Sequence, residues 1–565
     1  MKKRLFGILI LVLTFWVVSG QKEVPLDYFE KPLEIPLILS GTFGELRSNH
    51  FHSGLDIKTQ QRTGLKVKAA AAGTVSRIKI SHFGYGKALY IQHPNGYSTV
   101  YAHLKKFSPE IEAYVKKQQY KKEAFEIELF PKPGLFNIEK GVLVGYSGNT
   151  GSSGGPHLHF EIRDANARPM NPFLFGIDIK DSSKPLVSKI LAYPLDKESQ
   201  INGSQKPIEI RLTPLKNGNL TAETIKAKGK IGFGIATVDK QDLANNKNGI
   251  YEITSSLNGS PNFTVKMDKF SFAETRYINR MIDYSYYKRN KDRVQKLFVE
   301  NNNPLSIYSD VSNFGILQIE DSLSYHYAIE VKDFKNNRTA ITIPIQGTHQ
   351  TIVKDSTPAN PNYYYYTNQS LSFEDGLFEV YIPKNALYEN TSLDLKTDGD
   401  ILYLHKEEIP IHKNISLYYD LSNYATRDQE KLFIGRYDYK DELFYVGANI
   451  KNGKLMARTR NFGNYGIGLD KTPPTIAPIN FNDDKWISKN TSLKLKIEDD
   501  VSGIKGYRAT VNGKFILMEY DYKTDTLTHD FSDNRVTDTE NHLKVIVTDN
   551  VGNSTTFEST FFRKN

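Results

Sequence analysis

The sequence predicts a mainly β protein made of several domains. The chain has 565 residues, more than one hydrophobic core supports, so we expect three or four domains. Short stretches in which apolar and polar residues alternate recur along the chain, and this period of two is typical of half-buried strands. Turn dipeptides such as Asn95-Gly96 separate the stretches, which favours antiparallel sheets joined by tight turns.

The first 20 residues have the pattern of a signal peptide. Three basic residues, Lys2 to Arg4, precede the apolar run 5–18, and small residues stand before Gln21. The run is shorter than the roughly 20 apolar residues that a membrane-spanning helix needs. We therefore expect residues 1–20 to be removed and the mature protein to be exported with no membrane span. An uncleaved anchor is the alternative.

Four domains are predicted after the signal peptide. They are an antiparallel-sheet domain over 22–180, a β-sandwich domain with a helical insertion over 185–348, a β-rich domain over 352–470, and an Ig-like β-sandwich domain over 471–565. Two of these domains share a short sequence motif. A strand that ends in Val-x-Asp333 precedes an asparagine-rich turn, and the same motif recurs at Asp549. The repeat predicts two copies of one β-sandwich.

Two helices are expected inside this β framework. Ser108 suits an N-cap and Pro109 the first helical position, and lysines gather near residue 122, so a helix is predicted over about 109–122. Ser271 and Glu274 have the spacing of a capping box that opens a second helix toward Tyr287.

The composition limits the kinds of function. The chain contains no cysteine, which excludes disulfides, thiolate metal sites and a cysteine nucleophile, and fits an oxidising compartment. Its net charge of +9 suits an anionic polymer such as a bacterial wall, although a solvated lysine-rich surface explains it equally well. The lysines are dispersed among acidic residues, so no nucleic-acid partner is expected.

The histidines concentrate in the first predicted domain. Seven of the 13 lie between residues 50 and 159. In the segment 156–162, His157, His159 and Glu161 alternate with apolar residues, which places both imidazoles on one face of a strand. Side chains two apart on a strand are about 6.5–7 Å apart, too far for both to bind one small metal ion easily. The spacing favours one ligand and one neighbour, as in a hydrolytic metal site.

Residues 40–175 resemble the M23 family, the zinc peptidases of the lysostaphin/LytM type that cleave peptidoglycan. The resemblance rests on several motifs in the family's order: His52-x-x-x-Asp56, Gly73-Thr-Val75, Gly84-Tyr-Gly86, Tyr101-Ala-His103-Leu104, and Pro156-His157-Leu158-His159. Two features depart from the family pattern. The link from Lys105 to Lys140 is unusually long, and Gly155 replaces a common serine or threonine. We expect this link to wall the cleft.

The resemblance implies a site and a function. His52, Asp56 and His159 would hold one Zn²⁺, and His103 and His157 would be the unligated catalytic histidines, with their individual roles left open. The implied activity is a zinc metalloendopeptidase that hydrolyses peptidoglycan cross-links, in the periplasm or, alternatively, secreted or at the cell surface. A non-catalytic LytM-type activator or scaffold of other wall hydrolases is the competing function. The C-terminal β domains are candidates for binding envelope protein partners.

Other groups near these motifs receive structural interpretations. We expect His50 to be a surface group or a group behind the metal ligands, and His93 to be structural, while His82 is uninformative. Tyr101 either lines the cleft or packs in the core.

Overall fold

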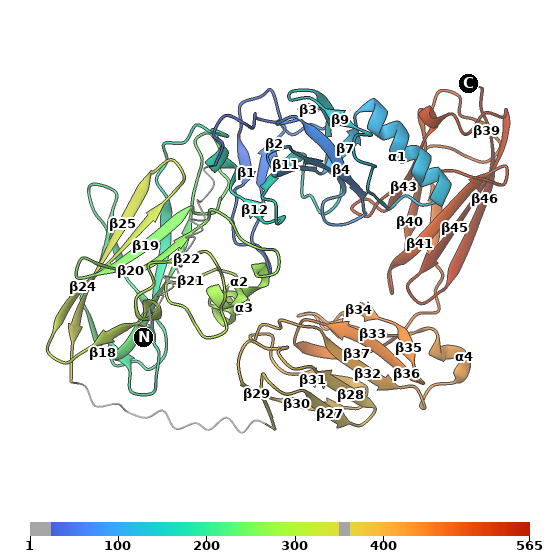
Figure 1. Ribbon diagram of the computed structural model, residues 1–565. Coiled ribbons are helices and arrows are strands. Elements are labelled where there is room, and N and C mark those ends of the chain that lie inside the picture. The colour runs from blue at the N-terminus through green and yellow to red at the C-terminus, as the bar shows by residue number, and fades with distance from the viewer. Residues whose placement is uncertain (1–23, 350–361, 565) are drawn as a thin grey trace, which may run out of the picture.

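The computed structural model describes residues 24–349 and 362–564, and it is mainly β, as predicted. The predicted signal peptide lies outside the described residues. Among the described residues, no helix combines the length and the apolar character needed to cross a membrane. Figure 1 shows four β units in chain order: the first and second units packed together, the third apart from the first, and the last beside helix α1.

The first unit contains a nine-stranded sheet that places the histidine-rich motifs side by side. Its strands are, in spatial order, β1 (Leu39–Gly41), β2 (Leu55–Lys58), β11 (His157–Arg163), β6 (Ser98–Ala102), β5 (Lys87–Gln92), β4 (Gly73–Ile80) and β8 (Ile127–Leu129), with β12 (Pro169–Met170) beside β11 and β9 (Asn137–Ile138) beside β4. A second sheet contains β3 (Lys66–Lys68), β10 (Leu143–Ser147) and β7 (Leu104–Phe107), and η1 (Pro172–Phe175) ends the unit. The pairs of strands within both sheets are antiparallel.

The first predicted helix is confirmed. Helix α1 (Pro109–Lys122) begins with proline and buries Ile111 and Val115 against the first unit. Ser108 has the extended backbone of an N-cap, but its side chain makes no capping hydrogen bond. The acidic first turn and basic last turn complement the helix dipole, so the sequence signals suffice to define this helix.

The second unit is built on a 13-stranded sheet. Its main path is β15 (Ile208–Ile210), β13 (Leu186–Pro194), β18 (Ile225–Val238), β25 (Arg338–Gly347), β24 (Ser324–Lys332), β19 (Glu252–Leu257), β20 (Ser260–Lys266) and β22 (Tyr308–Ser309). The strands β14 (Gln200–Ile201), β16 (Leu212–Pro214), β17 (Leu220–Ala222), β21 (Gln295–Lys296) and β23 (Leu317–Ile319) extend it, and η3 (Asn313–Gly315) precedes β23. Strand β25 pairs parallel with β17 and β18.

The second predicted helix is interrupted. The capping box forms in part, because Glu274 Oε1 accepts the backbone N–H of Ser271 at 2.6 Å. The segment then forms η2 (Thr275–Tyr277), α2 (Ile278–Met281) and α3 (Tyr284–Asn290). Ile282 is extended and forms a β-bridge with Gln295, and Asp283 then caps α3. A tertiary strand contact therefore overrides the local preference for one continuous helix.

The third and last units are each built on two facing groups of strands. The third has β27 (Leu371–Asp375), β28 (Phe378–Ile382), β32 (Ile415–Asp420), β36 (Lys454–Thr459) and β35 (Asn449–Lys451) in one sheet, and β30 (Leu395–Asp398), β31 (Ile401–Leu404), β37 (Gly463–Leu469), β33 (Leu432–Tyr437) and β34 (Leu443–Gly447) in the other, with the pair β26 (Tyr363–Tyr365) and β29 (Thr391–Leu393) and helix α4 (Thr426–Gln429). The last has β38 (Thr475–Pro478), β40 (Ser492–Glu498), β44 (Thr526–Asp530) and β43 (Glu519–Asp521), facing β39 (Lys485–Trp486), β46 (Ser554–Phe562), β45 (Glu540–Asp549), β41 (Ile504–Val511) and β42 (Lys514–Phe515), with η4 (Phe531–Asp533). Each unit has its own apolar core.

The first and second units share a continuous apolar core, which includes Phe43 from one and Met267 and Phe270 from the other. Buried polar contacts join them as well. Gln241 of the second unit accepts the N–H of Leu39 at 2.8 Å and donates to the carbonyl of Leu37 at 2.9 Å. Gln241 therefore holds the segment that leads into β1.

The last unit packs against the long link of the first (Figure 1). Tyr120 of α1 hydrogen-bonds Asp533, and Glu123 pairs with Arg508. The buried Lys87 of β5 pairs with Glu519 at 2.8 Å. The link thus provides a platform that holds the last unit.

Candidate metal centre

Strands β2 and β11 bring the two predicted metal motifs together. They pair antiparallel with His159 directly opposite Asp56, so two side chains that are 103 residues apart in the sequence are neighbours in the sheet. His52 lies just before β2, where its backbone pairs with the loop at Gly44 and Glu45. The period of two in β11 then places His157 and Glu161 on either side of His159 on the same face.

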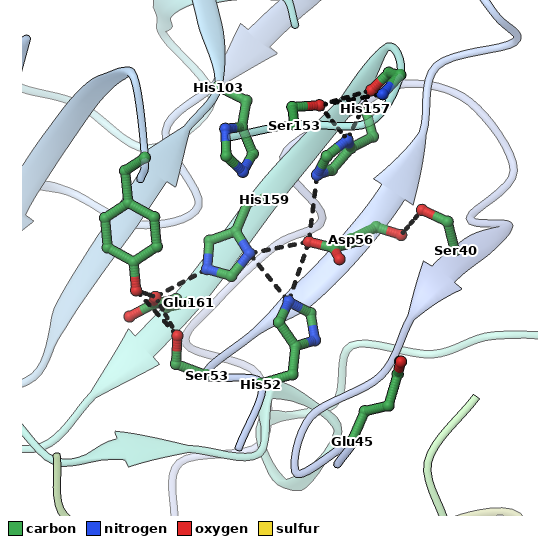
Figure 2. Close-up of polar contacts among 12 residues, drawn as sticks. Ser40, Glu45, His52, Ser53, Asp56, His103, Ser153, His157, His159 and Glu161 are labelled. Carbon is green, nitrogen blue, oxygen red and sulfur yellow. Dashed lines mark hydrogen bonds and ion pairs between the residues drawn. The ribbon is translucent and has the colours of Figure 1, made fainter. Parts of the chain in front are cut away.

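The three predicted ligands form a compact, buried triangle (Figure 2). His52 Nε2 lies 3.0 Å from Asp56 Oδ1 and 3.1 Å from His159 Nδ1, and His159 Nδ1 lies 2.9 Å from Asp56 Oδ1. Tetrahedral zinc with bonds of about 2.0–2.1 Å needs ligand atoms roughly 3.3 Å apart. The donor set therefore fits a small metal ion with little adjustment.

Hydrogen bonds fix which ring nitrogen of each predicted ligand faces the triangle. His52 Nδ1 lies 2.8 Å from the carbonyl of Thr42, which can only accept, so this nitrogen carries the proton. His159 Nε2 lies 2.8 Å from Glu161 Oε1 and likewise donates. The lone pairs of His52 Nε2 and His159 Nδ1 are thereby directed at the triangle, as metal binding requires.

The two remaining predicted site histidines are also oriented by hydrogen bonds from a ring nitrogen to a backbone carbonyl. His103 Nδ1 donates to the carbonyl of Thr150 at 2.8 Å, and His157 Nδ1 donates to the carbonyl of Gly155 at 2.8 Å. Their Nε2 atoms are left as acceptors beside the triangle, and His157 Nε2 lies 3.3 Å from Asp56 Oδ1. The ring centroids of His103 and His157 are 4.7 Å apart, so both rings face the same space.

His103 is aimed at the site by an unusual backbone conformation. It lies between the end of β6 and the start of β7 with a φ of 58°, in the left-handed region that costs a non-glycine residue about 1–3 kcal/mol. Strand alternation would place the side chains of His103 and Tyr101 on the same face, and this kink breaks the alternation. Tyr101 is fully buried, and its hydroxyl accepts the N–H of Ala70 at 2.7 Å, so its role is packing.

Glu161 lies directly behind His159, and the sequence analysis gave it no role. It is fully buried, and its Oε1 accepts from His159 and from Ser53 Oγ at 2.7 Å, with the Tyr85 hydroxyl as a further donor. Its Oε2 accepts from Arg163 Nε at 2.6 Å. The alternation that grouped Glu161 with the two histidines on one face was the available signal.

The charges of the site follow from these contacts. Burial alone would raise the pKa of the Asp56 carboxyl, but the neighbouring His52, together with His157 and His159 beside the carboxylate, holds it well below its usual range. Burial likewise opposes ionisation of Glu161, and the Arg163 guanidinium overcomes it and lowers the pKa. Burial, with repulsion from His159 and His157, lowers the pKa of His103 to about 3. His103 is therefore a neutral imidazole at physiological pH.

An open groove leads to the triangle. A cavity of about 570 Å³ is lined by residues that include Ile35, Lys58 and Gly154 and reaches Asp56 and His157. Beside the triangle, Arg47 Nη2 donates to Asp56 Oδ2 at 3.1 Å and so occupies the carboxylate oxygen that the triangle leaves free.

His50 and His93 lie where the sequence interpretation put them. His50 is exposed, and its Nδ1 lies 2.8 Å from the Ser48 carbonyl. His93 is buried between the carbonyl of Ala72 and the hydroxyl of Thr99, as a structural residue would be.

The fold and the site together define a β protein with a buried two-histidine, one-carboxylate group that could bind a metal ion. Residues 50–120 match the model of peptidase family M23, and residues 362–470 match that of a Zu5-like domain. The chain therefore contains an M23-family metallopeptidase domain, which confirms the resemblance found in the sequence.

The similar proteins match only part of the chain. The DD-carboxypeptidase/endopeptidase Mpg of Neisseria meningitidis is 35% identical over 127 residues, 22% of this chain and 23% of that protein. The peptidoglycan DD-endopeptidase ShyA of Vibrio cholerae is 31% identical over 131 residues, 23% of this chain and 24% of that protein. The chain thus spans about a quarter of these curated relatives. The catalytic domain of lysostaphin from Staphylococcus simulans aligns at 22% identity and a TM-score of 0.19, over 25% of this chain and 93% of that domain.

Proposed function

We propose that this chain is a zinc-dependent endopeptidase that hydrolyses peptide cross-links of peptidoglycan in the cell envelope. The observation that carries the proposal is the complete constellation: three donor atoms within 3.1 Å of one another, with two further imidazoles facing them. The name of the Vibrio relative, a peptidoglycan DD-endopeptidase, supports the substrate, and a peptidoglycan substrate is the basis for the periplasmic location that we infer.

The donor set suits zinc. Two neutral imidazole nitrogens from His52 and His159 and one oxygen of Asp56 make a three-ligand site, which in catalytic zinc proteins leaves a position open. Zinc held there would supply Lewis acidity, polarising the scissile carbonyl and lowering the pKa of a water molecule toward about 7.

The chain's own residues handle the proton. His103 and His157 both present an unprotonated Nε2 to the site, because their Nδ1 protons are given to backbone carbonyls. One of them accepts the proton of the attacking water as its oxygen bonds the carbonyl carbon, and as an imidazolium it donates to the departing amine. Each histidine is a candidate for this role, and the other can position the substrate.

The position of the last unit favours a restricted substrate. The hydroxyl of Tyr522 lies 3.5 Å from the carbonyl of Gly151, next to the Thr150 carbonyl that holds His103. Phe83 packs on Tyr522 with ring centroids 4.6 Å apart. A bulky β unit beside the loop that holds His103 would exclude folded proteins from the site. Extended peptides, such as the stems of peptidoglycan, could still enter.

The competing function is a non-catalytic activator of other wall hydrolases. Such a protein has no need of oriented, unligated imidazoles. Here Gly155 and Thr150 fix the tautomers of His157 and His103, and Glu161 fixes that of His159. This arrangement favours catalysis.

The test is digestion of purified sacculi by the mature protein, with the products identified by mass. We expect release of soluble muropeptides, loss of release with a chelator, and recovery when zinc is restored. The His159→Ala protein should be inactive. A matched control is His93→Gln, because His93 is also a buried histidine of the same unit but lies away from the triangle. Cleavage by His159→Ala at the wild-type rate would end the proposal.

A further inference from the structure

Two clusters of aspartates lie outside the metal centre. One contains Asp181, Asp239 and Asp333 around the second unit, and the other contains Asp470, Asp499 and Asp549 around the last unit. In each cluster the three residues offer carboxylate oxygens that lie within 4.8 Å of one another. Buried like charges at this distance repel strongly unless a cation or protons neutralise them.

The two clusters are the same arrangement built twice. Asn337 donates its backbone N–H to Asp333 Oδ1 at 2.9 Å and its Nδ2 to Asp333 Oδ2 at 2.7 Å. In the last unit, Asn553 donates its N–H to Asp549 Oδ1 at 2.8 Å and its Nδ2 to Asp549 Oδ2 at 2.7 Å. These are the two turns that the sequence repeat singled out.

The two clusters also match at the aspartate where the chain enters each unit, Asp181 in the first and Asp470 in the second. The same asparagine amide also reaches the backbone carbonyl of Asp181 at 3.2 Å in one case and of Asp470 at 3.0 Å in the other. Asp181 and Asp470 each stand four residues before a proline, and the carbonyl of each proline accepts from a threonine hydroxyl. Each cluster therefore lies at the junction with the preceding unit.

A small cavity accompanies the first cluster. It has a volume of about 20 Å³, the size of a single water molecule or ion, and its lining includes all three aspartates and Asn248. Asn248 is only 2% exposed, and neither its Oδ1 nor its Nδ2 has a hydrogen-bond partner among the described residues. Buried polar atoms without partners are rare in folded proteins and point to a missing ligand.

The carboxylates around this cavity also lack a balancing charge. Asp239 is 5% exposed, and its Oδ1 has no hydrogen-bond partner in the described part of the chain. Lys335 lines the cavity, but its ammonium pairs with Asp178 at 2.6 Å instead. Burial, with repulsion from Asp181 and Asp333, raises the pKa of Asp239 to about 8. In the second cluster, Asp470 is 1% exposed and its Oδ2 is likewise unpartnered within the described residues.

We propose that each cluster binds one Ca²⁺ ion, which joins a β-sandwich unit to the unit before it. The donors are all oxygens, mostly carboxylates, with the Asn248 amide oxygen beside the first cluster, and such sets are typical of calcium. Mg²⁺ demands a more regular octahedron, and zinc favours nitrogen or sulfur donors. The proposal is independent of the peptidase activity.

The first of these sites connects to the metal centre through the loop before β2. Thr42 lines the same cavity, and its carbonyl is the acceptor that orients His52. Its hydroxyl also accepts the backbone N–H of Gly249 in the second unit at 2.9 Å. An ion at this junction would therefore stiffen the segment that carries a predicted zinc ligand.

The test is calorimetric titration of the calcium-stripped full chain with CaCl₂ and, separately, with MgCl₂. We expect two calcium sites per chain, tighter binding of calcium than of magnesium, and a higher Tm with calcium. Asp239→Asn and Asp499→Asn should each lose one site. At about pH 9, above the raised pKa of Asp239, each should also raise the Tm of the calcium-free protein, because each removes a repelling charge without changing the side chain's shape.

Controls separate this result from misfolding and from the zinc site. Asp398→Asn, an exposed substitution in the third unit, should keep both sites, and so should His159→Ala. The rise in calcium-free Tm distinguishes charge removal from structural damage, which would lower it. No calcium binding by the wild type at millimolar concentration, or two sites retained in both cluster variants, would overturn the proposal.

Discussion

Replacing Glu161 by glutamine tests whether this carboxylate positions the zinc ligand His159. Glutamine retains the shape and one oxygen, so His159, Ser53 and Tyr85 can still donate to it. The charge is lost, and a charge-assisted hydrogen bond is roughly twice as strong as a neutral one. Loss of such a partner behind a metal ligand weakens metal binding by roughly 10–100-fold, or about 1.4–2.7 kcal/mol.

The second consequence concerns Arg163. Its guanidinium is 11% exposed and pairs with Glu161 Oε2 at 2.6 Å, so glutamine would leave a mostly buried cation facing an N–H₂ group. Breaking a buried ion pair on one side costs about 3–5 kcal/mol. We expect the lower end, because the guanidinium also stacks 4.7 Å from the ring centroid of Phe272.

The assay is competition for zinc against a chromophoric chelator, with circular dichroism to establish folding and thermal unfolding of the metal-free protein to report stability. The matched control is Glu128→Gln. Glu128 pairs with Arg77 on an adjacent strand of the same sheet, but its side chain is 40% exposed, so its loss should cost less than about 1 kcal/mol and leave zinc affinity unchanged. A zinc Kd for Glu161→Gln within twofold of the wild-type value would refute the reasoning.

Three further outcomes are expected. His103→Ala and His157→Ala should each lower kcat by roughly 10²–10⁴-fold while zinc content stays at one per chain, and loss of zinc in both would contradict their unligated role. Gly86→Ala should lower activity at least tenfold, because its Cβ would lie 2.4 Å from Thr150, whose carbonyl holds His103. Gly84 has a similar positive φ but open space around its Cβ position, so the loss of activity in Gly84→Ala should be small. Equal losses in the two variants would argue against the steric explanation. Between pH 7 and pH 5, the free energy of unfolding of the metal-free wild type should fall by about 2 kcal/mol more than that of His103→Gln. The reason is that the pKa of His103 is about 3 in the folded state and about 6.5 in the unfolded state, so stability is lost as the pH falls between these two values. Parallel pH profiles of stability for the two proteins would contradict this.

The sequence by itself determined the mainly β class, helix α1 and the peptidase family. These features depend on local or ordered signals. The period of two puts His157 and His159 on one face, Pro109 with its acidic first turn begins the helix, and motifs in a fixed order mark the family.

Only the tertiary structure decided which atoms meet. No sequence period could show that His103 adopts a φ of 58°, because the conformation depends on neighbouring segments that contact it from Tyr85 and Thr150. The continuous helix expected after Ser271 fails for the same reason, since a bridge from Ile282 to Gln295 outweighs helix propensity. Long-range pairing also gathers the six aspartates at two junctions, because contacts between residues tens of positions apart or more leave no local trace in the chain.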